Sequence, residues 1–108
     1  MPDTMDLRGI EVDVAANTLR LLLREGETSV SEQVPATIDI GAGGRLIGVE
    51  LSSGYIDVME PETGTEHLTR SAAATVEVGR AGEGGLPVAV TVPRRGAGYE
   101  VTYPSGNQ

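Results

Sequence analysis

Alternating apolar and polar residues predict β-strands along most of the chain. Residues 10–14 (IEVDV) alternate apolar and acidic side chains, as a half-buried strand does. Residues 18–24 (TLRLLLR) place the leucines at odd positions 19, 21 and 23 on one face. Asn17 lies between the two segments and tolerates the left-handed backbone conformation of a tight turn. The two segments therefore predict a first hairpin.

The pattern continues beyond this hairpin, with one interruption. Further strands are predicted over residues 36–40, 45–51, 55–59, 75–78, 87–92 and 98–103. The glycines of residues 41–44 predict a turn, and the polar residues 25–35 predict at most a short strand. Residues 60–74 break the alternation, and Thr65 is a suitable N-cap for a helix that reaches Ala74. We expect a loop there with at most two helical turns.

These elements predict an all-β fold. We expect an antiparallel sandwich or partly closed barrel of about seven or eight short strands, with at most one short helix. The length of 108 residues suits a single domain over residues 1–108. The chain has no Phe and no Trp, so its core must be aliphatic.

One hairpin resembles a known family. The string IDIGAGGRLIGVEL, residues 38–51, resembles a hairpin of a small bacterial and archaeal family, number twenty-two eighty-three of the domains of unknown function. The resemblance covers about residues 10–58, and the β-rich half at about residues 60–103 has no counterpart. Val12 and Asn17 depart from the tyrosine and aspartate of that family, and the acidic turn is glycine-rich here. Because the family has no established activity, the resemblance implies a fold alone.

Composition narrows the chemistry. The chain has no Cys, no Lys and one His, which excludes disulfides, cysteine-bound zinc, Schiff-base lysines and a multi-histidine metal site within one chain. Sixteen acidic and eight basic residues give a net charge of −8, which disfavours nucleic acid as a partner. No apolar run approaches the roughly 18 residues that a membrane span needs. We therefore expect a cytoplasmic protein without cofactor, catalytic residues, nucleic-acid partner or membrane partner.

An acidic cluster is the weak candidate for a metal site or an acid–base pair. Its members are Asp57, Glu60, Glu62, Glu66 and His67. Their spacing matches no calcium loop, and Pro61 and Gly64 favour a solvated loop instead.

Apolar residues on both faces of a strand provide the leading functional hypothesis. Leu22 lies opposite the odd-numbered leucines, between Arg20 and Arg24, and Leu46 lies opposite the apolar face of its own strand. Such residues are either buried within the chain or meet another chain. We predict a non-enzymatic interaction module that forms a homodimer through Leu22. The alternatives are a small-ligand or metal binder, at a barrel mouth or at residues 57–67, and an antitoxin-like neutraliser of a basic partner protein.

Overall fold

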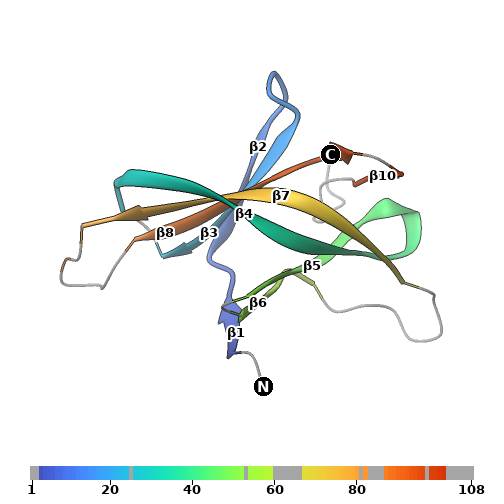
Figure 1. The fold of residues 1–108 in the computed structure, drawn as a ribbon, viewed down its shortest axis with the longest axis horizontal. Helices are drawn as coiled ribbons and strands as arrows, with labels where there is room; N and C mark the ends of the chain where they lie inside the picture. Colours follow the sequence, from blue (N-terminus) through green and yellow to red (C-terminus); the bar gives the residue numbers. More distant parts are fainter. Residues whose placement is uncertain are drawn as a thin grey trace.

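The computed structural model describes residues 3–24, 26–52, 54–59, 67–80, 82, 87–96 and 98–101. Its strands are β1 (Asp3–Asp6), β2 (Gly9–Asp13), β3 (Thr18–Arg24), β4 (Thr28–Ile40), β5 (Leu46–Leu51), β6 (Gly54–Asp57), β7 (Leu68–Gly79), β8 (Val88–Pro93), β9 (Arg95–Gly96) and β10 (Tyr99–Glu100). A three-residue 3-10 turn, η1 (Ala42–Gly44), joins β4 to β5 (Figure 1). The predicted all-β fold is confirmed. In the described part of the chain, no helix is long and apolar enough to cross a membrane.

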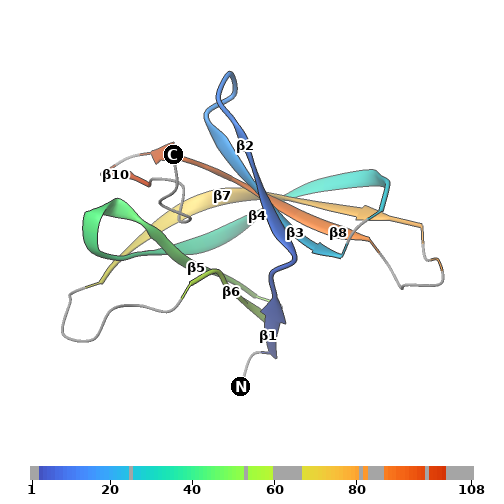
Figure 2. The ribbon, with the colours of Figure 1, turned by 180° about the vertical axis from the view of Figure 1, so that it is seen from behind.

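The main sheet is curled, and a short link joins the two strands at its edges. Its strand order is β1-β6-β5-β4-β7-β8-β3-β2, so β1 and β2 lie at opposite ends of the order. Yet Leu7 and Arg8 alone separate these two strands in sequence, and the Arg8 amide donates to the Leu22 carbonyl at 2.7 Å. The ribbon accordingly runs from β1 directly into β2 (Figure 2). The result is a partly closed barrel, in which β1 pairs with β6 in parallel and every other described pair is antiparallel.

Two long strands pass from one side of the barrel to the other. β4 pairs with β7 along its whole length, whereas β5 pairs with β4 at Thr37–Ile40 alone. In the same way, β8 pairs with β7 at Thr75–Val78 alone. The sequence predicted only the C-terminal part of each long strand.

The core is aliphatic, as composition required. Its fully buried large side chains are Leu19, Leu21, Ile38, Leu46, Ile56, Val49, Val90, Val92 and Val101. Leu19 and Leu21 belong to the odd-numbered face predicted for residues 18–24, and Leu23 packs against the same cluster. Each such side chain contributes roughly 1.5–3 kcal/mol by leaving water. The hairpin β9–β10 carries an exposed Arg95–Glu100 ion pair of 2.8 Å. Val101, which directly follows this hairpin, is buried in the core.

The helix predicted to reach Ala74 is wrong for the part of it that the structure describes. Residues 68–74 belong to β7 and pair with β4 from Ile40 to Val34. Ala74 is buried and Ala72 partly buried, whereas Ser71 and Ala73 are exposed. Small side chains therefore alternate with period two, and pairing with β4 overrides the helical preference of alanine. Thr65 lies outside the described residues.

Leu46 is fully buried inside the core, whereas simple alternation predicted that it lies on the face opposite Val49. The register shifts between Asp39, which pairs with Gly48, and Ile40, which pairs with Leu46. Ile47 is thus the extra residue of a β-bulge, and a bulge reverses the alternation of faces on one side of itself. Leu46 therefore joins Val49 in the core.

Gly48 is needed where Tyr55 crosses β5. The Tyr55 hydroxyl donates to the Asp39 carboxylate at 2.9 Å, and a Cβ on Gly48 would overlap the Tyr55 ring and hydroxyl. The glycine allows this close approach, which explains its place inside a strand. Burial is the main cause that raises the pKa of Tyr55, and the hydrogen bond to Asp39 raises it further. Among the described residues, Asp39 forms no ion pair, and its carboxylate accepts the hydrogen bond from Tyr55 instead.

Candidate interaction face

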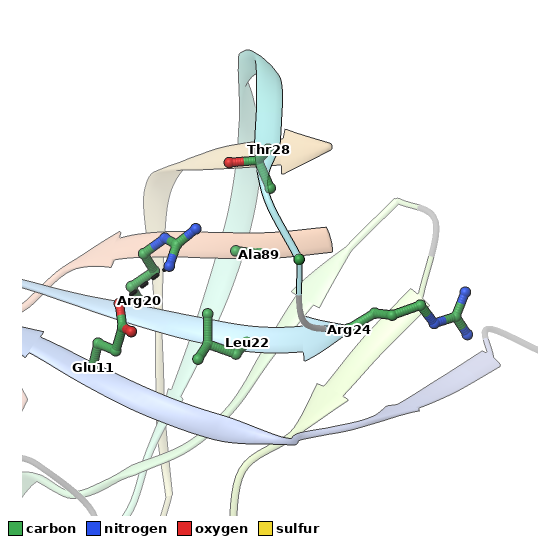
Figure 3. Close-up of a pocket in the computed structure, with 7 residues that line it drawn as sticks. Glu11, Arg20, Leu22, Arg24, Thr28 and Ala89 are labelled. Atoms are coloured by element: carbon green, nitrogen blue, oxygen red, sulfur yellow. Dashed lines mark hydrogen bonds and ion pairs between the residues drawn. The ribbon is translucent and has the colours of Figure 1, made fainter. Parts of the chain in front are cut away.

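A shallow pocket of about 270 Å³ lies on the outer face of β2, β3 and β8. Figure 3 shows six of the residues that line it: Glu11, Arg20, Leu22, Arg24, Thr28 and Ala89. We call these residues, together with Glu77, which Arg20 contacts and which is paired with Ala89, the β3 face. They include Arg20, Leu22 and Arg24, which the sequence analysis proposed as interface residues.

Leu22 forms the apolar centre of the β3 face. Its cross-strand neighbours are Gly9 on β2 and Ala89 on β8, two of the smallest residues available. A Cβ on Gly9 would lie 3.7 Å from Leu22 Cδ1, so the leucine side chain leans over the glycine. Ala89 is almost fully buried, but Leu22 remains part exposed. The centre of the face is thus one part-exposed leucine flanked by two small residues.

Arg20 forms ion pairs with two carboxylates at one end of the face. Its Nη1 donates to Glu11 Oε1 at 3.1 Å, and its Nη2 donates to Glu77 Oε1 at 2.9 Å. Thr28 Oγ1 donates to the same Glu77 oxygen at 2.9 Å. These contacts hold the pKa of Glu77 below its ordinary value, and the hydrogen bond from Arg20 contributes more than the one from Thr28. The hydrogen bond to Glu77 is likewise the main cause that raises the pKa of Arg20.

Arg24 lies at the opposite end of the face. The register of β3 on β8 shifts between Leu22 and Arg24, so Leu23 is the extra residue of a second bulge. The Arg24 side chain is exposed and extends away from Arg20 (Figure 3). Among the described residues, no ion pair involves Arg24.

The β3 face consequently has two ends of opposite charge. At one end, two carboxylates and one guanidinium sum to a net charge of −1. At the other end, Arg24 contributes +1. Leu22 lies between these two ends, and this arrangement of an apolar centre with a charged rim is common at protein interfaces.

The other candidates from the sequence do not join this face. Leu46 is buried in the core and offers no surface. Asp57, at the end of β6, and His67, before β7, are both exposed. Glu60, Glu62 and Glu66 lie outside the described residues, so the acidic cluster stays a prediction. Within the described ranges, no group of three or more His, Cys, Asp or Glu side chains is placed to hold a metal ion.

Sequence reasoning missed Glu11, Thr28, Glu77 and Ala89 as members of the site. Glu11 had a signal, because it alternates with apolar residues on the strand that precedes Arg20. Glu77 and Thr28 had none, because the pairing of β3 with β8 and of β8 with β7 brings Glu77 beside Arg20, and the pairing of β4 with β7 brings Thr28 beside Glu77.

No family model, curated protein or solved structure matches the chain. The resemblance of residues 10–58 to family twenty-two eighty-three therefore stays a prediction.

Proposed function

We propose that this chain is a non-enzymatic interaction domain that forms a homodimer through the β3 face. The observation that supports the proposal is the separation of opposite charges across Leu22. Two-fold dimers are the commonest soluble assemblies, and their interfaces must be complementary to themselves. A surface with −1 at one end, +1 at the other and an apolar centre meets this requirement.

The two-fold operation can be followed on strand β3. A two-fold axis that lies above Leu22, parallel to the sheet and perpendicular to β3, brings the two faces together and places the two copies of β3 antiparallel to each other. Arg24 of each copy then lies over the partner's cluster of Glu11, Arg20 and Glu77. The two Leu22 side chains meet at the axis, where they exclude water from the ion pairs around them. Electrostatic complementarity of this kind favours one relative orientation over others.

Chain composition supports a binding role over a catalytic one. Nucleophilic catalysis by Cys or Lys is excluded, and the single histidine, His67, is exposed. The strongly shifted pKa among the described groups belongs to Tyr55, whose hydroxyl is engaged with Asp39. The β3 face offers an ion-paired arginine, a residue type enriched at protein interfaces, beside the apolar Leu22.

Sedimentation equilibrium over about 1–200 μM tests the dimer, a range that brackets common weak homodimer affinities. Leu22→Glu places a carboxylate at the axis, so we expect a folded monomer with the far-UV circular dichroism of the wild type. Arg24→Glu removes both intermolecular ion pairs, and we expect the dissociation constant to rise by at least about tenfold. A wild-type chain that stays monomeric at about 100 μM contradicts the proposal.

Two variants isolate the electrostatic argument. Arg80→Glu makes the same change of net charge at an exposed position outside the face, so we expect the dimer to be unaffected. Combining Arg24→Glu with Glu11→Arg exchanges the signs of the two ends, and we expect this double variant to regain much of the lost affinity. If Arg80→Glu weakens the dimer as much as Arg24→Glu does, overall charge and not the β3 face governs association.

A further inference from the structure

A second surface lies at the mouth of the barrel, along the N-terminal half of β4. β5 leaves β4 after Thr37, so residues 28–36 have β7 on one side and no described strand on the other. This part of β4 runs along the margin of the sheet (Figures 1 and 2). Its outward edge therefore presents backbone donors and acceptors that a further strand can pair with.

A groove of about 190 Å³ accompanies this edge. We call it the β4 groove; its lining includes Val30, Glu32, Val34, Leu51, Val76 and Val78. Val30 is 65% exposed, whereas Leu51 is buried at the end of β5. The groove is smaller than the roughly 300–1,000 Å³ of common ligand pockets. It suits a few side chains of a peptide better than it suits a whole small molecule.

Glu32 determines the charge of the segment that fits. It lies between Val30 and Val34 on β4, so its carboxylate is the anionic group in a wall that is otherwise apolar except for Ser52. A strand added to the β4 edge would direct alternate side chains at these three positions. Small apolar side chains match the two valines, and a basic side chain matches Glu32.

The same residue disfavours a second copy of this chain as the occupant. In two-fold antiparallel pairings of the β4 edge with itself that are centred on residues 31–33, Glu32 faces either the partner's Glu32 or one of the partner's two valines, Val30 and Val34. The first arrangement opposes like charges, and the second covers a carboxylate with an apolar group. Pro35 adds to this protection, because it has no N–H to donate to another strand. Self-pairing of the β4 edge in these registers is therefore disfavoured, whereas a basic segment can pair with this edge.

We infer that the β4 groove binds an extended peptide segment of a partner protein by strand addition, with a basic residue opposite Glu32 between two small apolar residues. Backbone pairing along residues 28–34 supplies affinity, and the groove with Glu32 supplies specificity. This surface is distinct from the β3 face. Binding here goes beyond the proposed dimer and does not depend on it.

The probe is a fluorescent heptapeptide of sequence threonine–valine–threonine–arginine–threonine–valine–threonine with blocked ends. We expect saturable binding by fluorescence anisotropy, together with slower hydrogen exchange at the amides of residues 28–34. Glu32→Arg should weaken binding at least about tenfold, and a peptide with glutamate in place of arginine should restore it. Glu50→Arg makes the same charge change on the exposed side of β5 and should leave affinity unchanged.

Two results overturn the inference. One is the absence of saturable binding up to about 1 mM peptide. The other is equal binding of a peptide methylated at alternate backbone nitrogens, since such a peptide cannot pair with a strand edge. Repeating the titration with Leu22→Glu separates this inference from the dimer. Peptide binding by a monomeric variant supports the β4 groove alone, and a dimer that binds no peptide supports the β3 face alone.

Discussion

Replacing Gly48 by alanine tests how Tyr55 packs across β5. The added Cβ would overlap the Tyr55 ring and hydroxyl and would lie 2.8 Å from the Ile56 carbonyl oxygen. The ring must therefore shift, and the carbonyl belongs to a strand that cannot easily follow. A shifted ring also takes the Tyr55 hydroxyl away from Asp39, which loses a hydrogen bond of 2.9 Å.

The expected cost is the sum of these two effects. Overpacking of a core contact costs about 1–3 kcal/mol, and a hydrogen bond to a charged acceptor is worth about 1.5–3 kcal/mol when buried. Because Tyr55 is part exposed, we take the lower half of each range and expect Gly48→Ala to lower the free energy of unfolding by about 2.5–4 kcal/mol. For a domain of this size, the melting temperature then falls by roughly 11–18 °C.

Urea denaturation followed by far-UV circular dichroism measures this change. Gly82→Ala is the matched control, because a Cβ there meets no atom within 4 Å; we expect a change below about 0.5 kcal/mol. In a Tyr55→Ala background, the cost of Gly48→Ala should fall by at least about 1 kcal/mol. If Gly48→Ala is as mild as the control, or costs the same with and without the tyrosine ring, the packing argument is refuted.

Two further predictions concern a buried leucine and a paired carboxylate. Leu46→Ala should destabilise by about 2–5 kcal/mol and Leu22→Ala by about 1 kcal/mol, because Leu46 is fully buried and Leu22 is only part buried; equal losses in urea denaturation would contradict this. Glu77→Gln should lower stability at neutral pH. Because folding lowers the pKa of Glu77, the difference between wild type and variant should persist above the ordinary value of 4.5 and vanish as the pH falls through the folded pKa, and urea denaturation across this range checks it.

Elements set by local sequence were predicted well. The leucine face of residues 18–24 follows from simple alternation, and Asn17 has the positive φ of 59° expected in its turn. The glycine turn before β5 also formed, with positive φ at Gly43 and Gly44. In each case the residue types within a few positions determine the backbone.

Features that depend on distant pairing were missed. The bulge at Ile47 reversed the face of Leu46; the neighbouring Gly48 is compatible with a bulge but does not specify its position. Residues 68–74 became a strand because β4 was there to pair with them. Sequence placed Arg20, Leu22 and Arg24 together because they share one strand. It did not place Glu77 beside Arg20, since two ladders, β7 with β8 and β8 with β3, must form before the two side chains meet.

The connection from β1 to β2 makes the first described segment the seam of the barrel. β2 pairs with its sequence neighbour β3, so that hairpin closes a short loop. β1 instead pairs with β6, at the end of the strand order opposite to β2. The two strands are about fifty residues apart in sequence, and the entropic cost of closing such a loop grows with its length. The seam is thus expected to close late in folding and to open first, since releasing β1 from β6 leaves every antiparallel ladder intact.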